Sequence, residues 1–271
     1  MKFSIVIVSY NAGNKLNETI RSVLAQTYDD YEIIVKDGCS NDGSIENIVS
    51  SGKLRVFVSK DRGIYDAMNQ AMEYVTGEYI LFLNCGDKLY SESVLEKASR
   101  FIGTVGGCLC YGDTFIRSRK GVVVYSDKLS DYQLMTKTVC HQSIFFAKEI
   151  FEKEKYDWET YRLAADMALY VKCIKKLGIT TRHLPMIVAD YEGNGTSETN
   201  AHRKQIMREK KSILKRYLSR KEYVLGSVMK LVSLKYFKEI LATSAWFRGM
   251  YERIAMVVLK RRATKYKESV D

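Results

Sequence analysis

The stretch SIVIVSYNAGNKLNETIRSVLAQTYDDYEIIVKDG, residues 4–38, decides the fold class of this chain. It opens with a β-branched apolar run that predicts a buried strand. Leu16, Ile20 and Val23 then recur at helical spacing, and YEIIVKDG at the end of the stretch is again rich in β-formers. A strand, a helix and a second strand in this order are typical of an α/β fold with a mainly parallel sheet.

The same alternation continues along the chain. A short helix through 45–49 is expected next, LRVFVS at 54–59 predicts a third strand, and GEYILFLN at 77–84 predicts a fourth. A helix over 64–75 stands between these last two strands. We therefore expect a mainly parallel central sheet flanked by helices, in which ligands bind beyond the carboxyl ends of the strands.

The second half of the chain shows a similar mixture. GGCLCYGD at 106–113 and GVVVYSD at 121–127 predict a β pair, and HQSIFFAKEIF at 141–151 predicts a strand that runs into a helix. YRLAADMALYVKCIKKLG at 161–178 carries an apolar stripe at helical period and ends in a glycine, which is typical of a helix and its C-terminal cap.

Polar residues follow each of the first four predicted strands. They are Ser9–Asn11, Asp37–Gly38, Lys60–Gly63 and Asn84–Asp87. Asp, Asn and Gly are ordinary turn formers, so each group alone is explained by a turn. Four such groups at one edge of a parallel sheet indicate a binding site instead.

The segment DRGIYDAMNQAM, residues 61–72, begins a predicted helix that buries Ile64, Met68 and Ala71. Its other face carries Tyr65, Asp66, Asn69, Gln70 and Glu73. Two interpretations are open for this face. In the first, the acidic residue in the first turn stabilises the helix through its interaction with the helix dipole, and the other polar residues are merely solvated. Alternatively, the face forms one wall of a site.

Composition limits the class of protein. The chain has 271 residues, of which 46% are hydrophobic, which suits one large domain with an appendage or two smaller domains. The longest uncharged runs, such as 3–14, are shorter than the about 18 residues of a membrane span. No signal peptide is predicted, and the six cysteines lack C-x-x-C spacing. We expect a cytoplasmic protein with reduced thiols.

The positive charge is concentrated in the C-terminal part. Residues 201–271 contain 19 Lys or Arg against 6 Asp or Glu, and residues 1–200 contain 24 against 26. We predict a catalytic domain at 1–200 and a basic helical extension at 201–271, whose last helix carries an apolar stripe from Phe237 to Val258. This extension is either a helical appendage, packed on the catalytic domain or on a second subunit in a homodimer, or an amphipathic anchor at an anionic membrane.

Several nucleotide-binding and catalytic motifs are absent from the sequence. It contains no G-x-G-x-x-G after a strand, no G-x-x-x-x-G-K-[ST], no G-x-S-x-G and no H-E-x-x-H. The chain therefore lacks the residues that are diagnostic of a dinucleotide dehydrogenase, a P-loop enzyme, an α/β-hydrolase or a zinc peptidase.

The chain closely resembles the family 2 glycosyltransferases with the GT-A fold, which build bacterial surface polysaccharides. Residues 4–44 are similar to the opening nucleotide-binding unit of that family, and DRGIYDAMNQAMEYVTGEYILFLNCGD at 61–87 is similar to the subset with G-I-Y-D-A-M-N before its metal motif. Weaker similarity in CHQSIFF, AADMALY and YEGNGTSE extends the resemblance to about residue 199. The resemblance implies a nucleotide-binding part at about 1–100 and an acceptor part at about 101–200.

The resemblance also implies roles for single residues. The residues that would bind the donor nucleotide are Tyr10, Asn11, Asp37, Asp42, Arg62, Asp66 and Asn69. Asp87 would hold a divalent metal ion, Mg²⁺ or Mn²⁺, although Asn84 departs from the family's D-x-D motif and leaves one charged ligand. Asp166 would be the catalytic base. Asp113, His141 and Gln142 are candidates for contacts with acceptor or diphosphate.

These roles lead to a functional expectation. We expect an inverting glycosyltransferase that moves a sugar from a UDP-hexose or UDP-N-acetylhexosamine to a saccharide or lipid-linked saccharide, in the cytoplasm or at the inner face of the membrane. One alternative is another sugar-nucleotide-binding enzyme or a nucleotidyltransferase. A nucleic-acid-binding protein that uses the basic tail is less consistent with the sequence, because the acidic rim of residues 1–200 repels phosphates and no nucleic-acid-binding motif is present.

Overall fold

The computed structural model describes residues 1–103, 107–193 and 200–243, with side chains except at 200–201 and 233–243. The predicted apolar stripe from Phe237 to Val258 therefore lies outside the described side chains.

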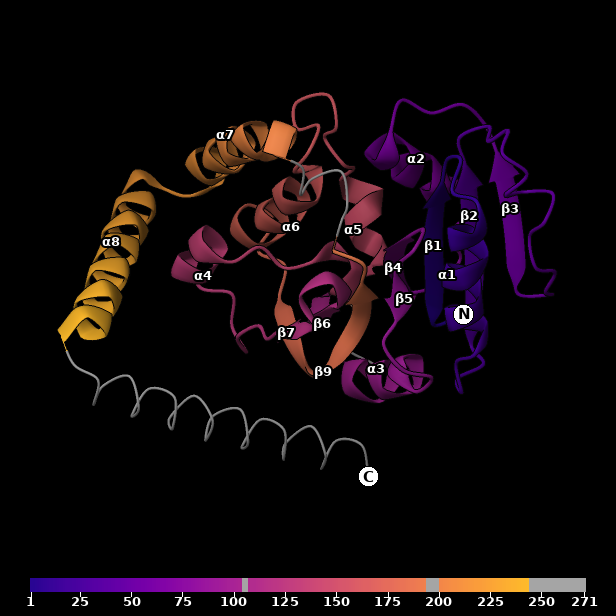
Figure 1. Cartoon of the computed structure of the whole chain (residues 1–271), viewed down its shortest axis with the longest axis horizontal. Helices are drawn as coiled ribbons and strands as arrows, with labels where there is room; N and C mark the ends of the chain where they lie inside the picture. Colours follow the sequence, from indigo (N-terminus) through magenta and orange to yellow (C-terminus); the bar gives the residue numbers. More distant parts are fainter. Residues whose placement is uncertain (104–106, 194–199, 244–271) are drawn as a thin grey trace. The chain divides into compact units, whose positions relative to one another are not determined.

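The chain divides into two compact units, whose helices and strands are labelled in Figure 1. Of the described residues, the first comprises those within Met1–Lys128 and Val139–Tyr217, and the second comprises Leu129–Thr138 and 218–243. The predicted boundary at residue 200 falls within the first unit.

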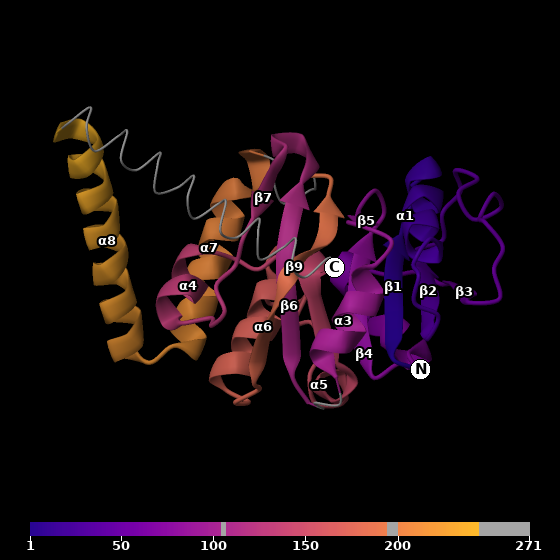
Figure 2. The ribbon, with the colours of Figure 1, turned by 90° about the horizontal axis from the view of Figure 1, so that it is seen from below.

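The strands of the first unit form one mixed sheet in the order β3-β2-β1-β4-β8-β6-β9-β5, with β7 paired to β6. Their bounds are β1 Phe3–Ser9, β2 Tyr31–Asp37, β3 Leu54–Val58, β4 Tyr79–Asn84, β5 Lys88–Leu89, β6 Leu109–Ile116, β7 Gly121–Val123, β8 Ile144–Ala147 and β9 Thr181–Tyr191. The first four strands pair in parallel, as predicted. The predicted pair β6 and β7 is antiparallel, and β6 and β9 run side by side in parallel (Figure 2).

Helices of the first unit alternate with these strands. They are α1 Asn14–Leu24, α2 Ile64–Ala71, α3 Val94–Ile102, α5 Lys148–Lys153, α6 Ala165–Lys175 and α7 Asn200–Tyr217, with 3₁₀ turns η1 Met72–Tyr74, η2 Arg117–Arg119 and η3 His141–Ser143. The predicted strand and helix over 141–151 and the predicted helix within 161–178 are confirmed by β8, α5 and α6. The fold is the expected α/β class.

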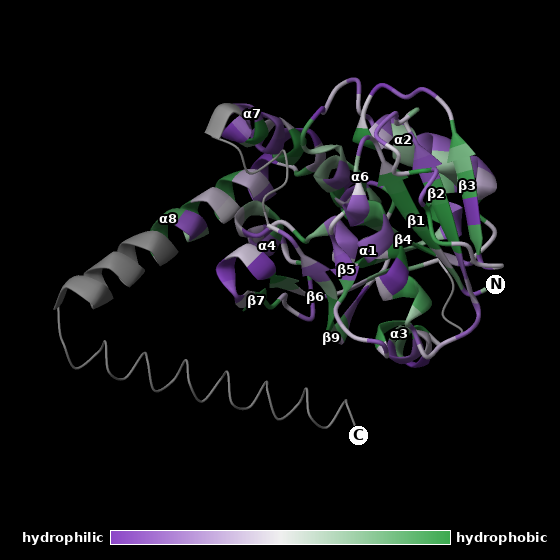
Figure 3. Cartoon of the chain, turned by 45° about the vertical axis from the view of Figure 1, so that its right-hand side comes forward, coloured by the Kyte–Doolittle hydropathy of each residue, from purple (hydrophilic) through white to green (hydrophobic). Residues whose placement is uncertain are grey.

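The centre of the sheet is the core of this unit. All residues of β1 and β2 are buried, which is typical of parallel strands covered on both faces. Figure 3 shows hydrophobic residues along these central strands. Their register places Ser9 opposite Asp37 and Val8 opposite Asn84. The carboxyl ends of β1, β2 and β4 therefore meet at one edge, as predicted.

Two local predictions are wrong. Residues 45–49 form a turn and irregular chain rather than a helix, because the N–H of Val49, which a helix would direct to the carbonyl oxygen of Ile45, donates to the side chain of Asn17. On α2, Ile64 is 41% exposed, whereas Tyr65 is 8% exposed. Ala67, Met68 and Ala71 are the other buried residues of this helix.

The second unit contains α4 Asp131–Thr136 and α8 Arg220–Thr243. Ser130 and Gln133 form a capping box at the start of α4. The two helices approach closely at Gly226, where a Cβ atom would lie 2.3 Å from the sulfur of Met135. Among the described side chains of α8, the exposed large apolar residues are Val224, Leu225, Val228, Met229, Leu231 and Val232.

Within the described part of the chain, we find no helix that combines the length and apolar character needed to cross a bilayer.

Candidate functional site

The loops after β1 and β2 are joined by hydrogen bonds. Asp37 is fully buried, and its two carboxylate oxygens accept from the backbone N–H of Ser40 at 2.7 Å and from its hydroxyl at 2.6 Å. The Ser40 hydroxyl oxygen accepts from the N–H of Asn11 at 2.7 Å, and Asp42 accepts from the N–H of Gly13 at 2.8 Å. Asn11, Asp37 and Asp42 thus shape these loops, and their contact with a nucleotide stays a prediction.

An exposed aromatic ring stands beside this pair of loops. Tyr10 is 67% exposed. A Cβ atom on Gly38 would lie 3.2 Å from Cδ2 of Tyr10 and 2.7 Å from Oδ2 of Asp61. Only glycine therefore lets the three residues approach so closely. The predicted stacking residue is accessible at the carboxyl edge of the sheet.

A buried lysine that the sequence interpretation overlooked orders the end of β3. The ammonium group of Lys36 donates to the carbonyl oxygens of Asp37 and Ser59 at 2.9 and 2.6 Å, and it lies 3.3 Å from Oδ2 of Asp61. Lys36 is fully buried, so the three oxygens compensate for the loss of water around its charge. Asp61 begins the segment DRGIYDAMN and is therefore held against the sheet.

The polar residues of α2 are occupied in part by contacts within the protein. Oδ2 of Asp66 accepts from the N–H of Arg62, just before the helix, at 2.8 Å, and the guanidinium of Arg62 lies 5.5 Å from the centroid of the Trp158 ring. The amide of Asn69 makes two bonds of 2.9 Å with the backbone of Tyr156. Asn69 thus joins the two halves of the unit, whereas the donor-binding role of Arg62, Asp66 and Asn69 stays a prediction.

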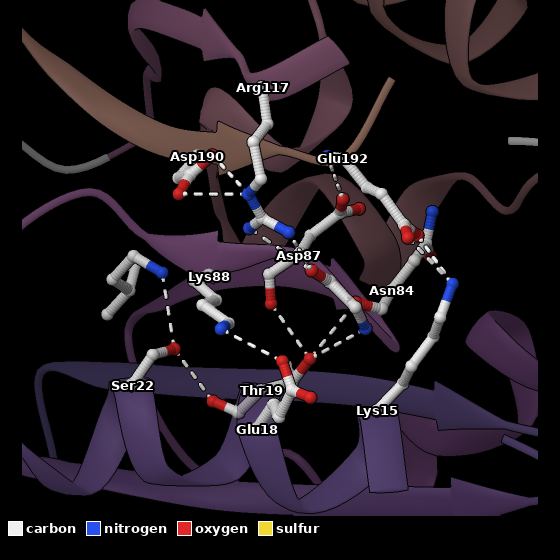
Figure 4. A network of polar contacts seen from close by, with 12 residues as sticks. Lys15, Glu18, Thr19, Ser22, Asn84, Asp87, Lys88, Arg117, Asp190 and Glu192 are labelled. Carbon is white, nitrogen blue, oxygen red and sulfur yellow. Dashed lines mark hydrogen bonds and ion pairs between the residues drawn. The ribbon is translucent and has the colours of Figure 1, made fainter. Parts of the chain in front are cut away.

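The turn after β4 carries a buried carboxylate. Asp87 is 2% exposed, and its oxygens accept from the N–H of Glu192 at 2.9 Å and from Nε2 of Gln142 at 2.7 Å. Burial raises the pKa of Asp87 to about 6, against the lowering effect of these donors. Thr19 holds the turn, since its hydroxyl accepts from the N–H of Gly86 and donates to the carbonyl oxygen of Asp87 (Figure 4).

The residues of this turn suit a hard divalent cation. Asp87 offers a carboxylate, and Oδ1 of Asn84 is buried without a hydrogen-bond partner. Oxygen ligands of this kind are those that Mg²⁺ and Mn²⁺ prefer, with waters and substrate phosphates in the remaining positions. Within the described residues, no group of three or more His, Cys, Asp or Glu could hold a metal ion alone. A cation here needs further oxygen ligands.

Asp166 lies in a second cluster of polar residues. It stands in the first turn of α6, where one carboxylate oxygen accepts from the hydroxyl of Tyr65 at 2.9 Å and the other lies 3.6 Å from Nδ1 of His141. Burial raises the pKa of Asp166, but the hydrogen bond and charge of His141, followed by the N–H of Met167 and the hydroxyl of Tyr65, outweigh it, so the pKa is lowered. The side chain is 17% exposed. An ionised carboxylate with access to solvent can accept a proton.

His141 and Gln142 connect the two carboxylates. His141 contacts Asp166, and the next residue, Gln142, donates to Asp87. His141 is 9% exposed, and its Nε2 atom is buried without a hydrogen-bond partner. The structure therefore brings together four residues that the sequence singled out, and Tyr65 joins them although no role had been predicted for it.

Asp113 makes different contacts. It is fully buried on β6, and its Oδ1 accepts from the N–H of Tyr125 at 2.8 Å and lies 3.0 Å from Nε2 of His183. The other ring nitrogen of His183 lies 3.0 Å from Asp127. Asp113 thus orders the chain after β7, and its predicted contact with acceptor or diphosphate stays a prediction.

The helix α7 supports the helix that carries Asp166. One carboxylate oxygen of Glu209 accepts from the N–H groups of Leu163 and Ala164, at 2.9 and 3.0 Å. These two donors precede α6 and have no partner within that helix. Glu209 therefore holds the start of α6, and with it Asp166, from a separate element.

Comparisons with known proteins agree with this arrangement. A family model described as "Glycosyl transferase family 2" matches residues 4–149, more than half of the chain. A PGL/p-HBAD biosynthesis glycosyltransferase of Mycobacterium tuberculosis is 33% identical over 207 residues, which cover 73% of this chain and 79% of the relative.

Two solved structures share the fold. TarS 1-349 of S. aureus, in complex with UDP-GlcNAc, has a TM-score of 0.58 and 18% identity over 80% of this chain and 71% of the other. The mannosyltransferase PcManGT of Pyrobaculum calidifontis, in complex with GDP-Man and Mn²⁺, has a TM-score of 0.59 and 17% identity over 99% of this chain and 84% of the other.

Proposed function

This chain belongs to glycosyl transferase family 2 and is a glycosyltransferase of glycan biosynthesis, and we propose that it acts by inversion on a UDP-linked hexose or N-acetylhexosamine. The acceptor is a saccharide or a lipid-linked saccharide of the bacterial cell surface. One observation supports this proposal most strongly. Asp166, ionised and partly exposed, lies in one polar cluster with Tyr65 and His141, and Gln142 joins that cluster to Asp87.

Asp166 has the properties of a general base. A sugar hydroxyl is a poor nucleophile until its proton has an acceptor, and a carboxylate held in its charged form provides one. Tyr65 contacts one carboxylate oxygen of Asp166 and His141 contacts the other, so the two residues together orient the carboxylate. In this proposal the hydroxyl oxygen attacks C1 of the donor sugar while its proton moves to Asp166, and the nucleoside diphosphate leaves.

The donor binds at the carboxyl edge of β1, β2 and β4. The exposed ring of Tyr10 is available for stacking on the base, and the loops ordered by Asp37 and Asp42 lie beside this ring. The related structures named above contain UDP-GlcNAc and GDP-Man, so a nucleotide sugar is the expected class of ligand. We propose UDP as the nucleotide.

A divalent cation fits the turn after β4. Asp87 and Asn84 would hold it, and such an ion neutralises negative charge that develops on a departing diphosphate. Gln142 and the N–H of Glu192 keep the carboxylate of Asp87 in place. Because burial disfavours the charged form of Asp87, a cation and the carboxylate stabilise each other in this position.

The variant Asp166→Asn tests the proposed base. Asparagine keeps the size of the side chain and can still accept from Tyr65, but it cannot take a proton. We expect turnover with a UDP-sugar to fall by about 10²–10⁴-fold, with an unchanged affinity for UDP and a similar melting temperature. Near-normal turnover of this variant on the same preparation would refute the assignment.

The second unit suits a peripheral contact with an anionic membrane. Six large apolar side chains of α8, from Val224 to Val232, are exposed, and Lys221 and Lys230 are exposed on the same helix. Apolar and basic groups together favour the interface of an anionic bilayer.

Vesicle sedimentation tests this contact. At low salt the full chain should bind vesicles that contain anionic lipid, and binding should weaken as salt increases. Removal of residues 226–271 should reduce binding. If the full-length protein does not bind such vesicles but forms dimers, and the truncated protein is monomeric, the helix is assigned to a homodimer contact instead.

A further inference from the structure

An ion pair lies over the turn that carries Asp87. The ammonium group of Lys15, at the start of α1, lies 2.7 and 2.8 Å from the two carboxylate oxygens of Glu192, which directly follows β9 (Figure 4). The side chain of Lys15 is 53% exposed and that of Glu192 is 32% exposed. A ligand from solvent can therefore reach both charged groups.

The pair lies directly against Gly86. A Cβ atom on Gly86 would stand 2.9 Å from Oε2 of Glu192 and 3.2 Å from Cδ of Lys15. The φ angle of Gly86 is 97°, in the region that favours glycine. Glycine therefore permits both the backbone conformation of the turn and the close approach of the ion pair. The backbone N–H of Glu192 also donates to Asp87. Glu192 thus touches the turn with its main chain and its side chain.

Glu192 can supply what the turn lacks for a cation. Asn84 provides a neutral oxygen, the unpartnered buried Oδ1, and Asp87 provides one charge. The affinity of oxygen sites for hard cations rises with the number of charged ligands. A second carboxylate that already lies against Gly86 would raise the affinity of this incomplete set.

Lys15 has the complementary chemistry. A partly exposed ammonium group with rotatable donors suits the oxygens of a diphosphate. In the chain without ligands, however, Lys15 and Glu192 neutralise each other. Each group is therefore free to bind its own ligand only when the other has released it.

We propose that Lys15 and Glu192 form a latch over the turn Asn84–Asp87, which a nucleoside diphosphate and a divalent cation open together. The cation takes the carboxylate of Glu192 as its second charged ligand beside Asp87 and Asn84, and Lys15 turns to the diphosphate. Binding of either ligand frees the group that binds the other, so the two ligands bind cooperatively. This inference rests on the proposed function, because it requires a nucleotide donor.

Mn²⁺ binding tests the latch without reference to turnover. The free Mn²⁺ concentration is measured by electron paramagnetic resonance in titrations of the full chain, with and without UDP, for the wild type, Glu192→Gln and Lys15→Met. Lys88→Met is the matched control, since Lys88 forms an ion pair of 2.9 Å with Glu18 of the same helix α1. Melting temperatures establish that each variant is folded.

Each variant has a distinct expected result. Glu192→Gln should weaken Mn²⁺ binding by about tenfold or more, because one charged ligand is lost. Lys15→Met should weaken UDP binding and should strengthen Mn²⁺ binding without UDP by up to about fivefold, the value of an exposed ion pair. Lys88→Met should resemble the wild type, in which UDP tightens Mn²⁺ binding.

Two outcomes separate this inference from the proposed function. A folded Glu192→Gln variant that binds Mn²⁺ like the wild type overturns the latch, even if the wild type transfers sugar. A wild type that binds Mn²⁺ with the expected pattern but transfers no sugar from any nucleotide donor overturns the proposed function and leaves the latch supported. A wild type that binds neither Mn²⁺ nor UDP overturns both.

Discussion

The substitution Tyr65→Phe isolates one hydrogen bond to the proposed base. It removes only the hydroxyl that donates to Asp166 at 2.9 Å. Burial raises the pKa of Tyr65 well above its usual value, and the charge of Asp166 adds to this effect, so the phenol stays protonated and donates. A hydrogen bond to a charged group contributes about 1.5–3 kcal/mol. If the bond orients Asp166 in the transition state, its loss should lower turnover by about ten- to a hundredfold.

The pH profile gives a second readout of the same substitution. Tyr65 is one of the groups that lower the pKa of Asp166, so its loss should raise that pKa and move the acid limb of kcat/KM to higher pH. A lowered pKa in the folded protein contributes stability that is present above the unfolded value and is lost as pH falls. Tyr65→Phe should therefore melt at a lower temperature at neutral pH, with less difference from the wild type in acid.

Tyr156→Phe is the matched control. The ring of Tyr156 lies 5.4 Å from that of Tyr65, but its hydroxyl is buried without a hydrogen-bond partner. Removal of an unsatisfied polar atom is neutral or stabilising. Steady-state assays that extend below pH 4, where the acid limb of a base with a lowered pKa lies, compare both variants with the wild type. Turnover and an acid limb in Tyr65→Phe that equal those of the wild type would refute the argument that this bond orients the base.

Two further substitutions test other parts of the site. Asp87→Asn should abolish Mn²⁺ binding in calorimetry, yet it should raise the melting temperature at pH 7.5 more than at pH 5. The pKa of Asp87 is raised to about 6, so its contribution to stability is present below the unfolded pKa and is lost as pH rises through 6. An equal rise in melting temperature at both pH values would contradict this reasoning. Glu209→Ala removes the acceptor for the N–H groups of Leu163 and Ala164, so kcat should fall about tenfold with unchanged UDP affinity. Glu209→Gln keeps an acceptor oxygen and should retain most of the wild-type kcat. A loss of UDP affinity in Glu209→Ala would show that α7 affects donor binding rather than the position of Asp166.

The sequence predicted the parallel half of the sheet because its signals are local. Each of the first four strands is rich in β-forming apolar residues and is followed by turn residues, and the candidate site lies where those ends meet. The predicted helix at 45–49 failed for a non-local reason. Asn17, which lies far away in the sequence, takes a backbone donor that a helix would need. No periodicity within 45–49 reveals this competition.

The roles of single residues were harder to predict, because they depend on which segments meet. Tyr65 stood on the polar face of a predicted helix, and its partner Asp166 lies a hundred residues away. Glu192 and Glu209 are ordinary surface residues in the sequence until β9 and α7 bring them to the site. Lys36 was the one detectable signal, since a lysine within the apolar run of β2 must find buried partners.

The consecutive residues His141 and Gln142 make the two carboxylates one system. They lie in a single 3₁₀ turn before β8, so a displacement of the backbone at one residue also displaces the other. His141 lowers the pKa of Asp166 and also acts on Asp87, while Gln142 donates to Asp87 alone. A cation at Asp87 would therefore pull on the same turn that orients the base. In our proposal donor binding and base orientation are thus coupled through this turn, and Gln142→Leu, which leaves Asp166 and His141 unchanged, should shift the acid limb of the pH profile together with Mn²⁺ affinity. A shift in Mn²⁺ affinity alone would show that the two carboxylates act independently.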